Sequence, residues 1–329
     1  MSVPTKYINE IQSFADKHSK YVKLAFLAAV VALSKEIDDE ALTAAIDSNS
    51  IDAIYRALHI DEFGNLLYGI GMDKDSLIYT DETRIIFSLA AAIAFSHLSS
   101  SQQKPWNYNP IEERAVALFT SDSSRIIREL TEGTKGGATL ASLRVLADKG
   151  DIEAEVLRIK QSIGLTGPQA QAVLNFRQQL ESRKLLGFSS PEDRKLSSAD
   201  ATLVRLQMKN GTMTQGNIDA IVGRYYENIL NARAESIAMA STMNAINSGI
   251  NNMFEQGLYQ GVFDAHDRKF WLTAGDNKVR ATHRAIPNMN PNGVQLNSMF
   301  VTPTGPVPYP MWGMGDYINC RCMIYLGRI

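Results

Sequence analysis

The sequence predicts a mainly α-helical protein, with an elongated helical body followed by a small, loop-rich C-terminal α+β domain that carries cysteine and histidine. Three observations support this prediction. Apolar residues recur at helical spacing over most of the chain up to residue 254. The pattern changes after Tyr259, and six of the eleven prolines lie between Pro287 and Pro310. Both cysteines, Cys320 and Cys322, belong to this last stretch.

Composition bounds the class of protein. The 329 residues suffice for two or three domains, and 45% apolar with 21% charged residues is typical of a globular chain with a real core. The net charge of −2 argues against sequence-independent coating of DNA, because proteins that do this carry a basic excess. Residues 264–329 hold seven Lys or Arg against four Asp or Glu, which is either compositional noise or a face for an acidic partner, DNA or protein.

Two short apolar runs, residues 24–33 and 85–95, are predicted to be buried helices. Each is too short to cross a bilayer, so we expect no membrane span. Glu10 and Asp16 precede the first run, which is unlike a secretory signal. The cysteines are separated by one residue, which makes a disulfide between them awkward and excludes a secreted disulfide scaffold.

Residues 1–100 are expected to form an N-terminal helical region. Three helices are predicted there, over residues 1–36, 40–58 and 81–98. Asp81 is the expected N-cap of the last one. The glycine-containing stretch 61–80 suits a hairpin or a loop, and residues 99–110, with serines and two prolines, are the best linker candidate.

Residues 105–260 are expected to form a helical body. Its first part is predicted as three short helices, over residues 111–119, 123–131 and 140–147. The three glycines within residues 133–137 are predicted to form a turn before the last of them. Thr166 and Gln169 have capping-box spacing, and Pro168 suits a first turn, so a helix is predicted to begin there. Apolar spacing then predicts one long helix, or two consecutive ones, over 217–254, with Gly249 as a bend.

Residues 261–329 are expected to form the C-terminal α+β domain. Short β-prone segments are predicted to be its strands: residues 269–273, 299–302 and 323–326. Trp271, within the first of them, is expected to fill the core of this small domain.

Cys320, Cys322 and His283 are candidate metal ligands. In an extended segment the two cysteines point to the same side, and two thiolates with one imidazole suit tetrahedral Zn²⁺. A small, loop-rich domain has a thin core that a metal would stabilise. His266, Asp276 or water are candidates for the fourth position. The alternatives are two buried thiols beside a hydrogen-bonded histidine, and a disulfide or redox role.

Asp276, Arg280 and His283 are expected to form a polar cluster that fixes the small domain. Asp276 would cap a short helix over 278–284, and Glu235 on the long helix would pair with Arg280. Use of Asp276, His283 and Glu235 as acid–base catalysts is the alternative. No nucleophile elbow, P-loop, H-E-x-x-H or dinucleotide fingerprint accompanies them, so the chain is not expected to be an enzyme.

The order of these residues resembles the head-morphogenesis (minor head protein) family of tailed bacteriophages, to which the F protein of phage Mu and the minor head protein of phage SPP1 belong. That family carries W-x-T-x-x-D-x-x-x-R-x-x-H, then a proline- and glycine-containing loop, then N-C-R-C. The matching residues here are Trp271, Thr273, Asp276, Arg280, His283, Asn319, Cys320, Arg321 and Cys322. The family's R-T-E reads Arg233-Ala234-Glu235 here, so its threonine is missing. The resemblance covers about residues 105–329.

The resemblance implies a low-copy structural component of the virion, placed at the portal vertex or inside the capsid and assembled in the bacterial cytoplasm. Its partners would be portal, capsid or scaffolding proteins, with the packaged DNA and other copies of the chain as further candidates. Such proteins can leave the head with the genome. The rival interpretations are a DNA-binding ejection protein and an enzyme or toxin-like module built on the Cys/His site. A zinc deaminase would need H-x-E, and the sequence has His283-Arg284-Ala285.

Overall fold

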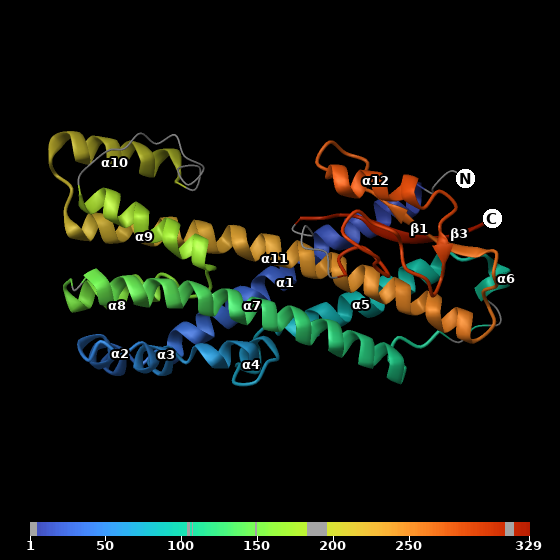
Figure 1. Ribbon diagram of the computed structural model, residues 1–329, viewed down its shortest axis with the longest axis horizontal. Coiled ribbons are helices and arrows are strands. Elements are labelled where there is room, and N and C mark those ends of the chain that lie inside the picture. Colours follow the sequence, from blue (N-terminus) through green and yellow to red (C-terminus); the bar gives the residue numbers. More distant parts are fainter. Residues whose placement is uncertain (1–4, 104–105, 107, 149, 183–195, 313–318) are drawn as a thin grey trace. The chain divides into compact units, whose positions relative to one another are not determined.

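The computed structural model describes residues 5–103, 106, 108–148, 150–182, 196–312 and 319–329 (Figure 1). It is mainly α-helical, with a small antiparallel sheet and a Cys/His group near the C-terminus, so the predicted fold class is confirmed. The chain forms two compact units. Unit 1 contains Met1–Phe26, Leu77–Ile126 and Glu235–Ile329, and unit 2 contains Leu27–Ser76 and Ile127–Ala234.

The two units do not coincide with the three consecutive regions expected from the sequence. Three of their four boundaries fall inside α1 (Thr5–Glu36), α7 (Glu113–Asp148) and α11 (Gln215–Tyr259), and the fourth lies between Ser76 and Leu77. The expected regions 1–100 and 105–260 therefore each contribute to both units, whereas 261–329 lies wholly in unit 1. The physical reason is length: a continuous helix of 32 to 45 residues can pack one part of its surface in each unit.

In the described part of unit 2, every secondary-structure element is a helix. Besides segments of the three long helices it contains α2 (Asp39–Asp47), α3 (Ile51–Leu58), η1 (Ile60–Glu62), α4 (Phe63–Leu67), α8 (Ile152–Lys160), α9 (Gly167–Glu181) and α10 (Ser198–Asn210). The capping box at the start of α9 is confirmed, with Gln169 Oε1 accepting from the Thr166 N–H at 3.0 Å. The predicted single helix 40–58 is two helices, because Asn49 between them is left-handed (φ 55°). The hairpin or loop expected over 61–80 contains η1 and α4.

The glycine turn expected near residues 133–137 is wrong, because α7 continues through it. A Cβ on Gly137 would lie 2.2 Å from the carbonyl oxygen of Leu165. The glycine is therefore required by the close approach of another backbone, and it does not mark the end of a helix. Gly249 is similar: α11 continues past it, and a Cβ there would lie 2.2 Å from the carbonyl oxygen of Phe87.

Unit 1 combines helices with a three-stranded sheet of order β2-β1-β3. Its helices are the remaining segments of α1, α7 and α11 together with α5 (Tyr79–Ser96), α6 (Ser100–Gln103) and α12 (Ala281–Met289). The strands are β1 (Asp267–Leu272), β2 (Val294–Gln295) and β3 (Met323–Arg328), all antiparallel. Helix α12 packs against β1 (Figure 1). The segment 299–302, expected as a strand, forms only an isolated bridge from Phe300 to Val307.

Helix α5 starts before its expected cap. Its N-cap residue is Ile78, and Asp81 lies in the first turn, where its carboxylate pairs with Arg84. The linker candidate 99–110 contains α6, and of its remaining described residues Trp106 is buried against Phe95 and Phe263.

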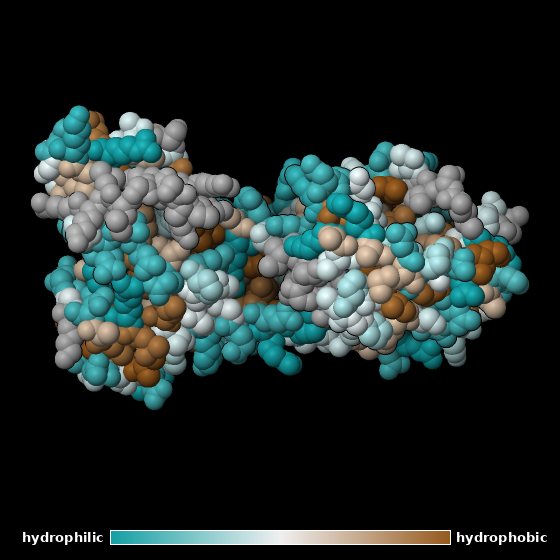
Figure 2. Space-filling view, turned by 45° about the horizontal axis from the view of Figure 1, so that its top comes forward, coloured by the Kyte–Doolittle hydropathy of each residue, from teal (hydrophilic) through white to brown (hydrophobic). Residues whose placement is uncertain are grey.

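The C-terminal half of α11 is buried even at polar positions. Asn247 and Ser248 are among these polar side chains. Buried polar groups need partners, and Ser248 donates to Asp122 of α7 at 2.9 Å. On the face turned to the viewer in Figure 2, hydrophobic side chains form small patches between hydrophilic ones. No helix among the described residues is long and apolar enough to cross a membrane.

Candidate metal centre

His283, Cys320 and Cys322 form one buried group in unit 1. Their ligand atoms all lie within 4.8 Å of one another. The Nδ1 atom of His283 lies 3.2 Å from Cys320 Sγ and 3.5 Å from Cys322 Sγ. The structure therefore brings together the three residues that the sequence predicted as metal ligands.

Local structure explains this convergence. His283 lies in the first turn of α12, on the side of that helix that is buried with Ile286. Asn319, directly before the cysteine segment, has a left-handed backbone (φ 58°), a conformation that asparagine tolerates. Cys320 and Cys322 are both buried while the intervening Arg321 is exposed, as expected when residues two apart share a side.

The donor set fits a tetrahedral metal. With Zn–S bonds of about 2.3 Å and Zn–N bonds of about 2.0 Å, a sulfur and a nitrogen ligand lie about 3.5 Å apart. The two measured sulfur–nitrogen distances are close to this value. Two soft thiolates and an imidazole are also the donors that Zn²⁺ prefers. The group could therefore hold a metal ion, with Cys320, Cys322 and His283 as its ligands.

Protonation is divided unequally between the two thiols. The hydrogen bond with Cys322, followed by the one with His283, lowers the pKa of Cys320 against the opposing effect of burial. The hydrogen bond with Cys320, followed by burial, raises the pKa of Cys322. Two adjacent buried thiols do not both ionise, because like charges repel in a poorly solvated site. A bound cation would remove this repulsion and favour two thiolates.

Trp271 covers the group from β1. Its ring lies edge-on to His283 at 6.1 Å and to Phe300 at 5.4 Å between centroids. The indole N–H is buried without a hydrogen-bond partner among the described residues, although it lies near enough to Cys322 to oppose in part the rise in the pKa of that thiol. A Cys322 thiolate would be the acceptor that this N–H lacks, as in the outer shell of many metal sites. The expected core role of Trp271 agrees with this placement.

Arg280 lies beside the group, and Asp276 does not belong to it. The charge of Arg280 opposes in part the rise in the pKa of Cys322 that Cys320 and burial cause. Helix α12 begins with Arg280 as its N-cap residue, so the helix expected over 278–284 is displaced toward the C-terminus. The exposed Asp276 accepts from the Lys278 N–H at 2.9 Å, in a turn that precedes the helix. Neither Asp276 nor His266 is part of the group of ligand atoms, so no fourth protein ligand is identified among the described residues.

Arg233 and Glu235 are not part of the metal group. Arg233 belongs to unit 2, where its buried guanidinium donates to the carbonyl oxygen of Gly164 and to the hydroxyl of Thr134. Burial lowers the pKa of Arg233 to about 10. Glu235 belongs to unit 1, and its carboxylate pairs with Lys23 of α1 at 2.9 Å, so the expected pairing with Arg280 is wrong.

The first helix also holds the C-terminal segment. Tyr7 donates from its hydroxyl to the carbonyl oxygen of Ile324 at 2.8 Å, and Asp16 pairs with Arg321 at 3.1 Å. From α11, the buried Asn247 amide donates to the Cys322 carbonyl at 3.0 Å and accepts from the Ile324 N–H at 3.1 Å. The roles of Tyr7 and Asn247 could not be predicted from the sequence, because no local signal links residues so distant in the chain.

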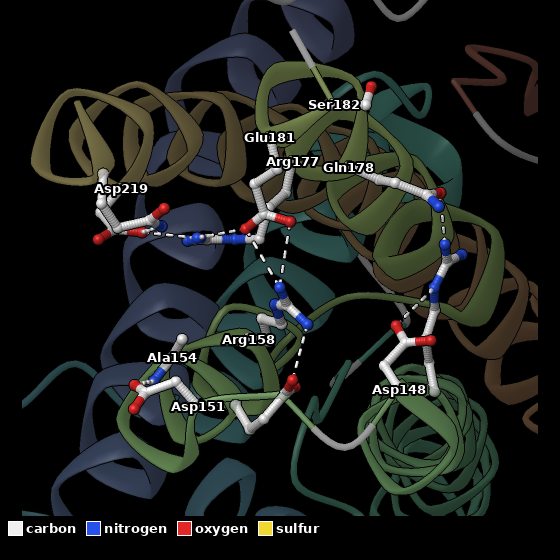
Figure 3. Close-up of polar contacts among 12 residues, drawn as sticks. Asp148, Asp151, Ala154, Arg158, Arg177, Gln178, Glu181, Ser182 and Asp219 are labelled. Carbon is white, nitrogen blue, oxygen red and sulfur yellow. Dashed lines mark hydrogen bonds and ion pairs between the residues drawn. The ribbon is translucent and has the colours of Figure 1, made fainter. Parts of the chain in front are cut away.

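Unit 2 contains a separate buried ion-pair network, drawn in Figure 3. The fully buried Arg177 pairs with Asp219 at 2.5 Å, and Arg158 bridges Glu155 and Glu181. The two guanidinium groups are thus matched by carboxylates. The network fixes α8, α9 and the start of α11 to one another within unit 2, and it does not form an anion-binding site.

Comparison with known proteins finds no family model, no curated protein and no solved structure that matches this chain.

Proposed function

We propose that this chain is a head-morphogenesis protein of a tailed bacteriophage, a structural component that acts without catalysis. The observation that supports this most is the convergence of Trp271, His283, Cys320 and Cys322 in one buried group. These four residues belong to the motif on which the resemblance to that family rests. These residues are far apart in the sequence but contact one another in the structure, which gives a physical reason for them to occur together as one motif.

The proposed role places the protein in the virion head, at the portal vertex or inside the capsid. Portal, capsid or scaffolding proteins are its proposed partners, and it would be assembled in the bacterial cytoplasm. Passage out of the head with the genome belongs to the same proposal. The net charge of −2 favours contacts with proteins over extensive contacts with the phosphate backbone.

The Cys/His group is proposed to hold a structural Zn²⁺. Cys320, Cys322 and His283 would be its ligands. A metal there would connect α12 to the segment that leads into β3, across a loop-rich region with few regular hydrogen bonds. Its role would be to stabilise this part of unit 1.

Metal analysis of the purified full-length protein tests the zinc proposal. We expect about one equivalent of zinc, which is lost in His283→Asn and in the Cys320→Ser, Cys322→Ser double variant. His266→Asn is the matched control, because it removes an exposed histidine that is not part of the group. Co²⁺ titration adds a direct measurement, since thiolate ligation produces a characteristic absorption. Folded protein without zinc and without a thiolate–Co²⁺ band would favour two buried thiols beside a hydrogen-bonded histidine.

A gene deletion tests the proposed role. In a phage that encodes this chain, we expect the deletion to yield empty heads, or heads of normal appearance that do not infect. Mass spectrometry of purified wild-type virions should detect the protein at low copy. A normal titre after deletion, or absence of the protein from virions, would contradict the proposal. The deletion phenotype and the detection of the protein in virions are both expected without any catalytic activity.

A further inference from the structure

A groove of about 440 Å³ lies along the outer edge of β3 in unit 1. Its apolar wall comes from helices α1, α5 and α11 and the α5–α6 connection, with Tyr7, Ala94, Leu98 and Phe254. Its other side is the strand itself, at Leu326 and Arg328. The groove is separate from the proposed metal centre, whose ligands do not line it.

The backbone of β3 directs hydrogen-bonding groups to this groove that have no partner in the described part of the chain. In an antiparallel pair, alternate residues direct both their N–H and their C=O away from the partner strand. Ile324 does so, because its N–H and C=O bond to Asn247 and Tyr7 and not to β1. By the register of β1 with β3, Leu326 and Arg328 share this orientation. Among the described residues, the N–H and C=O of Leu326 have no hydrogen-bond partner.

Two positions on the outer edge of β3, Ile324 and Leu326, differ in how their backbone groups are covered. The edge at Ile324 is covered by two side chains from different helices, which is a common way to prevent further strand pairing. At Leu326, no described residue covers the edge, which lies beside an apolar wall. Backbone groups at strand spacing next to apolar side chains are the features that bind an extended peptide.

The charges around the groove favour a basic segment. Glu10 contacts His97, a residue of the groove, at 2.8 Å. Asp264 and Asp267 both pair with Arg328, at 2.7 and 3.4 Å. The three carboxylates of Glu10, Asp264 and Asp267 thus outnumber the one guanidinium of Arg328, and this acidic excess would attract Lys or Arg.

We propose that this groove binds an extended segment of a partner protein, which adds to β3 as a further strand. The segment would pair its backbone with Leu326 and Arg328, direct alternate apolar side chains at the wall formed by Tyr7 and Leu98, and carry Lys or Arg at its ends.

The test uses full-length protein and a fluorescein-labelled probe peptide, Lys-Val-Thr-Val-Thr-Lys, in anisotropy titrations. Two further peptides carry N-methyl groups on both valines or on both threonines. Because the N–H groups of a strand alternate between its two sides, one methylated peptide should bind about tenfold more weakly and the other nearly normally. A version with glutamate in place of both lysines should bind more weakly. An equal loss of affinity in both methylated peptides, or no loss in either, would overturn the proposed strand addition. Undiminished binding of the glutamate peptide would overturn the proposed preference for a basic segment.

A protein variant and hydrogen exchange locate the bound peptide. Ser99→Trp fills the groove from its exposed rim, and Ser100→Trp places the same bulk on the next residue, which does not line it. We expect the first variant to weaken binding at least about tenfold and the second to leave it unchanged. Saturating peptide should slow amide exchange in residues 323–329. No measurable binding at millimolar peptide, no such protection, or equal effects of the two variants would overturn the proposal.

Discussion

Replacing Lys269 by Met should reduce the pH dependence of the protein's stability between pH 7 and 10. Lys269 is on β1, is almost completely buried, and donates from Nζ to Asn251 Oδ1 at 2.8 Å. The ring of Phe300 lies 5.8 Å from this nitrogen, and Glu255 contributes a nearby opposite charge. Burial outweighs that charge and lowers the pKa of Lys269 from 10.5 to about 8.

The sign of the effect follows from proton binding. Between pH 8 and 10.5 the unfolded chain keeps a proton on this lysine that the folded protein has lost, so the free energy of unfolding rises with pH in this interval. Below pH 8 both states are protonated, and the cost of burying the charge is fully present. A difference of about 2.5 pKa units corresponds to ~3 kcal/mol, most of which should be regained by pH 10.

Urea unfolding at pH 7, 8, 9 and 10 measures this effect as the difference between wild type and Lys269→Met. Taking the difference cancels the titration of other groups, including the tyrosines. The stability of the wild type relative to the variant should rise by about 2 kcal/mol over this range. Lys278→Met, which removes an exposed lysine, is the control and should give a flat difference. A flat difference for Lys269→Met as well would refute the reasoning, because it would mean that the lysine keeps its ordinary pKa in the folded protein.

Three further substitutions test individual contacts within the two units. Gly137→Ala should destabilise unit 2 by ~2 kcal/mol or more in thermal unfolding, because its Cβ would overlap a backbone carbonyl, whereas Gly136→Ala, with nothing within 4 Å, should be neutral or slightly stabilising. Asn247→Ala should cost ~2–4 kcal/mol in urea unfolding, because it leaves two buried backbone groups of the C-terminal segment without partners. Asp219→Ala should cost ~3 kcal/mol by the same assay, because Arg177 would keep its charge in a buried site, and an unchanged stability would show that this ion pair contributes little.

Local signals in the sequence were sufficient for several of the helices and for the type of the last domain. Apolar spacing predicted α1 and α11, and the capping box at Thr166 predicted the start of α9, because these features depend on neighbours within a few residues. The spacing of Cys320 and Cys322 likewise determined that both side chains point to one side. The same local reasoning failed at Gly137, where a glycine is needed for contact with a distant backbone and not for a turn.

Only the tertiary structure decided how distant segments combine. The sequence alone could select His283 as the partner of the cysteines by residue type, and it established the mainly α-helical class. It could not show that Tyr7 and Asn247 hold the strand after those cysteines, or that Glu235 pairs with Lys23. These contacts join residues separated by tens to hundreds of positions. They depend on how long helices pack, and neither periodicity nor spacing along the chain contains that information.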